Sequence, residues 1–191
     1  MSFVRWAPTI LSFPIGGWVA TTVVGPVTGP PAAALAGAIA GAAIGAAQWW
    51  ALGRRVNWTW LLGSILGMAA GSALSAALTG AATTVVALIT AGLVAGATMG
   101  AAQGLSLRRG VRVTGLWAAT VGLSWGAGWA ITANVIIDAE SGYVIFGLSG
   151  ALVVTIVTGL VIRRILGRTP RLTVPDVAST APQPSAEAPS R

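Results

Sequence analysis

The sequence predicts an all-α integral membrane protein of six transmembrane helices, built as three tandem helical hairpins with both termini in the cytoplasm. Three observations lead to this fold class. Hydrophobic residues make up 55% of the chain and charged residues only 8%, whereas soluble domains carry about 25% charged residues. Six apolar stretches of about 20 residues are each long enough to cross a bilayer. All the basic residues are arginines, and they gather between alternate stretches.

Turn residues separate the six stretches. We expect helices over residues 7–24, 31–52, 58–78, 84–107, 113–137 and 143–166. Gly25 and Pro26 end the first stretch, and Pro31 suits the first turn of the next helix. Pro14 predicts a kink within 7–24. A cleaved signal peptide is the alternative for this stretch, but no small-residue cleavage site precedes a polar start of a mature chain.

The arginines predict the orientation in the membrane. Arg5 precedes the first stretch, Arg54 and Arg55 follow the second, Arg108, Arg109 and Arg112 follow the fourth, and Arg163, Arg164, Arg168 and Arg171 follow the sixth. The other connections hold no basic residue, and the last of them carries Asp138 and Glu140. Under the positive-inside rule, the arginine-bearing side is cytoplasmic. These arginines also attract anionic lipid headgroups, by about 1 kcal/mol each.

Composition bounds the domains and the compartment. Residues 1–168 form the predicted transmembrane domain. Residues 169–191 form a predicted disordered cytoplasmic tail, rich in Pro, Ala, Ser and Thr and too poor in large apolar residues to fold. An all-arginine basic set with abundant Ala and Gly is typical of a GC-rich bacterial genome.

A repeat of about 55 residues divides the predicted transmembrane domain into units 1–55, 56–110 and 111–168. Gly37, Gly41 and Gly45 recur 55 residues later as Gly92, Gly96 and Gly100; Gly67 and Gly71 likewise recur as Gly122 and Gly126. The third unit is degraded, with Thr158 in the position of Gln48 and Gln103. A unit of two spans returns to its starting side, so the copies are parallel repeats. Both a pseudo-threefold bundle and a side-by-side fan fit.

The glycine runs predict close helix packing, because residues four apart lie on nearly one helix face. A narrow pore wall is the alternative. Gln48 and Gln103 are candidate interhelical polar residues, since an amide in hydrocarbon needs a partner. The alternative is that the two glutamines form a ligand-binding pair.

The tryptophans cluster near the expected membrane interfaces. Trp49, Trp50, Trp58, Trp60 and Trp117 are expected in an aromatic belt at headgroup depth on the cytoplasmic side. Trp18, Trp125 and Trp129 lie deeper or nearer the outer face, and are expected to pack in the core or, alternatively, to bind a pigment or lipid.

The residue inventory argues against catalysis. The chain has no Cys and no His, and no ionisable residue lies within any predicted span. Thiolate chemistry, histidine bases and metal clusters are therefore not expected, nor is a cofactor, and we expect no enzyme. The net charge of +7 suggests nucleic acid until the arginines are located, after which topology explains it better.

The segment from Gly45 to Arg55, GAAQWWALGRR, is followed by Trp58 and Trp60 and then by Gly63, Gly67 and Gly71. It resembles a glycine-rich "QW…L.RR…W" repeat in uncharacterised multi-pass membrane proteins of Chloroflexi and cyanobacteria. The second copy departs from the pattern at Gly104, where the first has Trp49. The resemblance implies a bacterial inner membrane and transfers no activity or site residues.

Two functions are compatible with these sequence features. The first is a non-enzymatic scaffold or accessory subunit held together by glycine-mediated packing, with the lipid bilayer, other membrane subunits or a second copy as partners. The second is a channel or facilitator for a small neutral solute, suggested by parallel repeats around a possible axis.

Overall fold

The computed structural model describes residues 3–135 and 147–167, and the regular elements in these ranges are all helical. They are α1 (Phe3–Trp6), the 3-10 helix η1 (Ala7–Leu11), α2 (Ser12–Val24), α3 (Pro30–Leu52), the 3-10 helix η2 (Gly53–Arg55), α4 (Trp58–Thr79), α5 (Val85–Ser106), α6 (Val111–Val135) and α7 (Leu148–Gly167). The acidic turn expected at 138–142 and the expected tail at 169–191 lie outside the described residues.

The first long segment is helical throughout but distorted before Pro14. A proline has no N–H to donate to the carbonyl four residues earlier, here that of Ile10. The five residues of η1, in the turn that contains Ile10, take the tighter 3-10 form. The hydroxyl of Thr9 donates to the Trp6 carbonyl at 2.7 Å, and that of Ser12 donates to the Thr9 carbonyl at 2.6 Å. The distortion that Pro14 predicts is therefore a 3-10 stretch.

Polar caps and glycines set the ends of the central helices. Asn57 and Thr84 cap the starts of α4 and α5, and each side chain accepts a backbone N–H from the first turn. At the other ends, Gly53 follows α3 with φ 56° and Gly80 follows α4 with φ 62°. This left-handed conformation favours glycine and stops a helix.

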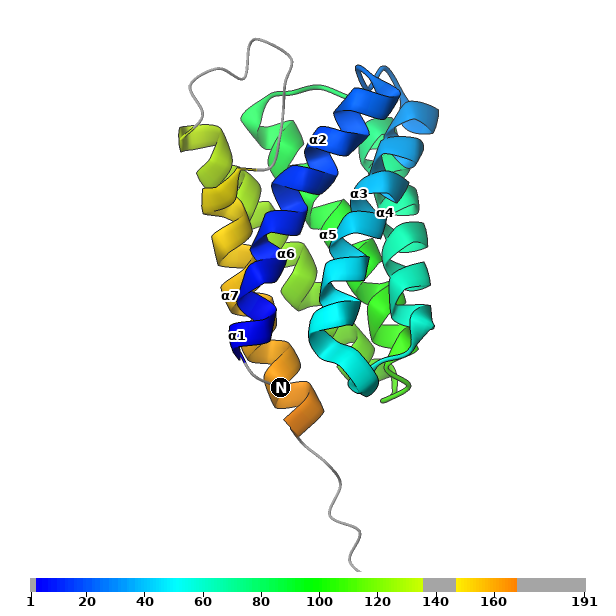
Figure 1. The fold of residues 1–191 in the computed structure, drawn as a ribbon. Helices are drawn as coiled ribbons and strands as arrows, with labels where there is room; N and C mark the ends of the chain where they lie inside the picture. Colours follow the sequence, from blue (N-terminus) through cyan, green and yellow to red (C-terminus); the bar gives the residue numbers. More distant parts are fainter. Residues whose placement is uncertain (1–2, 136–146, 168–191) are drawn as a thin grey trace, which may run out of the picture.

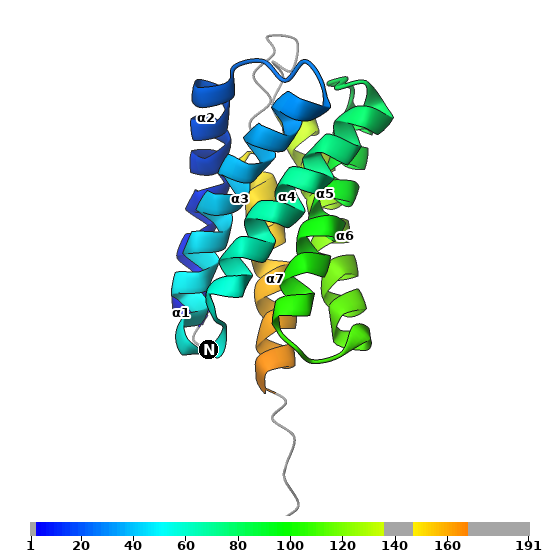
Figure 2. The same cartoon turned by 90° about the vertical axis from the view of Figure 1, so that its right-hand side faces the viewer.

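The helices form a closed bundle. Each long helix packs against the next one along the chain, from α2 to α7, and α7 returns to contact α1, η1 and α2. The N-terminus and the last turn of α7 lie at the same end of the bundle, the lower end in Figures 1 and 2. The turns that carry Arg54, Arg55, Arg108 and Arg109 lie at this end too, which we call the arginine end.

Five helices among the described residues are long and apolar enough to cross a membrane: the segment Val4–Val24, Pro30–Arg55, α4, α5 and α7. The remaining expected span, 113–137, corresponds to α6, which has 25 residues but falls short in apolarity. Its sequence is rich in Gly, Ser, Thr and Trp, which lower hydropathy without preventing helix formation. Among the described residues, the fold is thus all-helical with five candidate membrane spans.

Candidate functional site

A buried hydrogen-bonded cluster joins four helices near the arginine end, and we call it the Gln103 cluster. The amide nitrogen of Gln103 on α5 donates to Gln48 Oε1 on α3 and to Ser64 Oγ on α4, both at 2.8 Å. Its amide oxygen accepts a bond of 3.0 Å from the Nε1 of Trp117 on α6. The structure therefore brings together the two glutamines that lie 55 residues apart in the sequence.

Helix periodicity places these side chains in the interior. Gln48 follows Gly45 by three residues and Gly41 by seven, so all three share the face of α3 that packs on α4. Gln103 has the same relation to Gly100 and Gly96 on α5. Thr158, the third repeat position, is also buried, but its hydroxyl donates to the Val154 carbonyl of its own helix. The third copy therefore contributes Trp117 to this cluster, but no side chain from the position equivalent to Gln48 and Gln103.

Trp60 and Trp117 lie inside the bundle and not in the expected aromatic belt. Both side chains have 0% exposure, and their ring centroids are 5.9 Å apart. Trp49, Trp50 and Trp58 are exposed, as an interfacial position requires. Trp117 uses its N–H on Gln103, whereas the Trp60 Nε1 is buried without a partner in the described part of the chain. A belt tryptophan and an interior one look alike in sequence because both flank the arginines.

Trp6 closes the bundle, a role that the sequence did not reveal. It is fully buried, and its Nε1 donates to the Thr155 carbonyl of α7 at 2.9 Å. Trp6, Trp60 and Trp117 lie 54 and 57 residues apart, near the start of the first helix of each predicted hairpin. Because these spacings differ from 55 residues, the 55-residue repeat does not align the three tryptophans.

The glycine run of α3 packs on α4, and the run of α5 packs on α6. A Cβ added to Gly41 would lie 2.5 Å from the Ser64 carbonyl oxygen. One added to Gly96 would lie 2.9 Å from the Val121 carbonyl oxygen. The same closeness holds for Gly37 and Gly45 against α4, for Gly92 and Gly100 against α6, and for Gly67 and Gly71 against α5. These glycines therefore pack against other helices of the same chain.

Gly122 and Gly126 do not repeat the role of Gly67 and Gly71. Gly67 and Gly71 face the following helix, α5, whereas Gly122 and Gly126 face the preceding one, which is again α5. Gly128, which lies 57 residues after Gly71, instead approaches Gly150 on the following helix, α7. Two extra residues rotate a helix face by about 200°. Gly122 and Gly126 thus pack closely on a neighbouring helix, but the 55-residue spacing does not preserve which neighbour that is.

Arginines tie helix ends together at the arginine end. The Arg5 guanidinium donates to the Trp50 carbonyl at 2.9 Å and lies 5.2 Å from the centroid of the Trp50 ring. The Arg109 guanidinium donates to the Ile165 carbonyl of α7 at 2.5 Å. Arg54, Arg55, Arg108, Arg163 and Arg164 are exposed. Cations near helix C-termini interact favourably with the last carbonyls, so the arginines stabilise the fold as well as marking a side.

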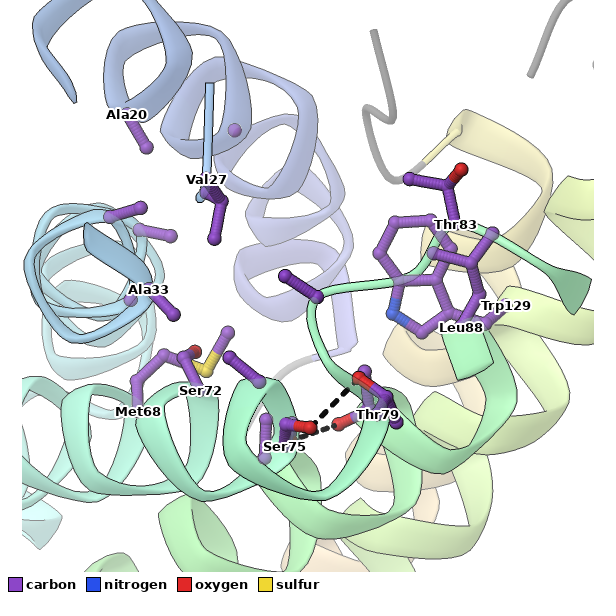
Figure 3. Close-up of a pocket in the computed structure, with 18 of the residues that line it drawn as sticks. Ala20, Val27, Ala33, Met68, Ser72, Ser75, Thr79, Thr83, Leu88 and Trp129 are labelled. Carbon is purple, nitrogen blue, oxygen red and sulfur yellow. Dashed lines mark hydrogen bonds between the residues drawn. The ribbon is translucent and has the colours of Figure 1, made fainter. Parts of the chain in front are cut away.

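A cavity of about 270 Å³ opens at the opposite end, between α2, α3, α4, α5 and α6 (Figure 3). Ala20, Ala33 and Met68 line it with apolar atoms. Ser75 and Thr79 also line it, but their hydroxyls donate to backbone carbonyls of α4 at 2.6 and 2.9 Å. The cavity therefore offers an apolar surface and few free hydrogen-bonding groups.

The cavity does not reach the Gln103 cluster. On α5 the lining ends at Ala95, eight residues or about 12 Å before Gln103, and on α4 it ends at Met68, four residues or about 6 Å from Ser64. Ile44, between the lining residue Ala40 and Gln48, and Met99, between Ala95 and Gln103, are exposed by only 2% and 1%. The described residues hold no group of acids, histidines or cysteines that could bind a metal. The site is thus a buried set of hydrogen bonds between four helices, and buried apolar side chains lie between it and the cavity.

These features define the class of the molecule as an all-helical bundle whose long apolar helices are those of a multi-pass membrane protein. Comparison with protein families, curated proteins and solved structures found no match.

Proposed function

We propose that this chain is a non-enzymatic scaffold or accessory subunit of a bacterial inner membrane, with six spans as three hairpins and both termini cytoplasmic. The observation that carries the proposal is the closed interior. The Gln103 cluster and the layer of Ile44 and Met99 fill the space in which a carrier would need a pathway. Arginine is the only ionisable residue type in the described ranges, and it is confined to the helix ends.

The contacts of α6 support its role as a further span, which brings their number to six. It packs between α5 and α7, and its small and polar residues face these neighbours. Its exposed face carries Leu116, Leu123 and Ile131. A bundle helix needs apolar side chains only where it meets lipid, so a lower overall apolarity is compatible with spanning.

Recurring contacts support three hairpins around an axis. Gly37 of the first copy meets Met68 of the second, and Gly92 of the second meets Trp125 of the third, with shifts of 55 residues on one side and 57 on the other. The bond from Trp6 to Thr155 joins the first copy to the third. A fan would leave those copies apart, so this bond favours the pseudo-threefold arrangement.

We expect the scaffold to be extracted from membranes in mild detergent together with a protein partner, or as a stable homo-oligomer. Affinity purification followed by light scattering and mass spectrometry measures this. The packing glycines are used inside the chain, so the contact surface would be the exposed leucines and valines of the outer faces. A strictly monomeric, partner-free protein would contradict the proposal.

A facilitator for a small neutral solute is the second candidate, because the cavity at the end opposite the arginines could form one half of a path. Proteoliposomes that take up glycerol or urea faster than empty vesicles would favour it. The control is the Ala40→Trp variant, which places a bulky ring at the cavity wall and should abolish genuine flux. Uniform impermeability would remove this candidate.

Single cysteines can test the orientation, since the chain contains none of its own. Ala82 lies in the α4–α5 connection, and the highly exposed Val111 starts α6 near the arginines. We expect a membrane-impermeant maleimide to label A82C in intact cells and V111C only after permeabilisation, because arginine-rich turns stay inside. Labelling of V111C from outside would reverse the proposed topology.

A further inference from the structure

A groove at the arginine end combines positive charge with an apolar wall. It lies between α6 and α7, next to the turn that joins α5 to α6, and has a volume of about 750 Å³. Arg108, Arg109 and Arg164 supply its guanidinium groups. Val113, Leu116 and Val161 supply apolar side chains, continuing from the charged mouth along the two helices. A ligand that fits both parts has an anionic head and a hydrocarbon chain.

The charge at the mouth calls for an anion. Arg109 is anchored by its bond to the Ile165 carbonyl, which fixes one edge of the groove. Arg108 and Arg164 are exposed beside it. The described part of the chain contains no Asp or Glu, because all four acidic residues fall in 136–146 and 168–191. Guanidinium groups hold phosphate oxygens through paired charge-assisted hydrogen bonds.

The backbone of Arg108 adopts a left-handed conformation in the turn beside the groove. Its φ is 53°, a left-handed conformation that side chains other than glycine adopt at a cost of about 1 kcal/mol or more. The residue 55 positions earlier is Gly53, which adopts φ 56° after α3. The second copy therefore holds an arginine where the first holds the residue that suits the turn. Because glycine suits this conformation, Arg108→Gly removes the guanidinium group and keeps the turn.

We propose that this groove binds the headgroup of an anionic phospholipid. The phosphate contacts Arg108 and Arg164, and an acyl chain lies along Leu116 and Val161. A free phosphate or a nucleotide would leave these apolar side chains uncovered, so the lipid is the occupant that the whole groove fits. Basic pockets between helices on the cytoplasmic side are suited to such lipids. The inference rests on the membrane placement proposed above.

The test uses the full-length protein in detergent, titrated with phosphatidylglycerol and phosphatidylcholine and observed by native mass spectrometry. We expect phosphatidylglycerol to bind preferentially, and Arg108→Gly and Arg164→Gln each to weaken it about fivefold. Arg163→Gln is the matched control, because it removes the same charge from α7 outside the groove. Arg108→Gly should also raise thermal stability, which separates loss of binding from misfolding.

Three results would overturn the site. These are equal binding of both lipids, an equal loss in Arg163→Gln, or inorganic phosphate displacing the lipid at millimolar concentration. Each leaves the scaffold proposal untouched, because partner retention is measured separately. Recovery of the protein from the aqueous fraction of a lysate would instead overturn the membrane placement itself.

Discussion

Replacing Gly41 by alanine is expected to destabilise the bundle by about 1–3 kcal/mol, and replacing it by leucine is expected to prevent assembly. The added Cβ would lie 2.5 Å from the Ser64 carbonyl oxygen and 2.7 Å from the Met68 Cβ. The first of these is backbone and cannot turn aside, so α3 and α4 must move apart. Unfolding in detergent, followed by circular dichroism or steric trapping, measures the loss.

Substitutions at two other glycines serve as controls for this prediction. At Gly96 an added Cβ would meet its nearest neighbours at 2.9 Å, so Gly96→Ala should cost less than Gly41→Ala. Gly115 lies on the exposed face of α6 with nothing within 4 Å of the added atom. Gly115→Ala should stabilise by about 0.5–1 kcal/mol, because alanine loses less backbone entropy in a helix. Equal effects at Gly41 and Gly115 would refute close packing of α3 on α4.

Replacing Gln103 by leucine is expected to cost about 2 kcal/mol, and up to ~5 kcal/mol if the released groups stay unpaired. The substitution removes three side-chain hydrogen bonds and leaves the Trp117 N–H and the Gln48 carbonyl without that partner. Thr158→Val at the equivalent position of the third copy is the control. Its hydroxyl bonds only within α7, so the change should be nearly neutral.

Two buried tryptophans allow the contribution of the hydrogen bond to stability to be separated from that of the indole ring. Trp117→Phe and Trp60→Phe remove the same atoms from fully buried positions, but only Trp117 donates to Gln103. The excess loss in Trp117→Phe, expected near 1 kcal/mol, measures the bond. If Trp60→Phe destabilised the bundle equally, the Gln103 cluster would contribute little beyond volume.

Local patterns predicted much of the fold and part of the site. Glycines and glutamines four and three residues apart share a helix face whatever surrounds them, so the run ending at Gln48 could be interpreted from spacing alone. The expected helix 58–78 agrees with α4 (Trp58–Thr79) to within one residue, because turn residues bound it. The apolarity of five spans is likewise a property of composition.

What sequence could not predict depends on register and on distant contacts. The alignment at 55 matched Gly126 to Gly71, whereas the contacts of α6 with α5 and α7 follow a shift of 57. Trp6 meets a carbonyl that lies 149 residues away, and a backbone acceptor leaves no side-chain signature. The strained turn at Arg108 is equally hidden, since arginine does not ordinarily indicate a left-handed residue.

The contact between Trp6 and Thr155 can form only after most of the chain has been synthesised. A ribosome adding about 15 residues each second needs about 10 s to make the 149 residues that separate them. Throughout this interval the flank of the first helix that α7 covers is unoccupied. The last helix of another nascent chain presents the same carbonyl, so exchange of α7 between two copies is the expected by-product of crowded overexpression.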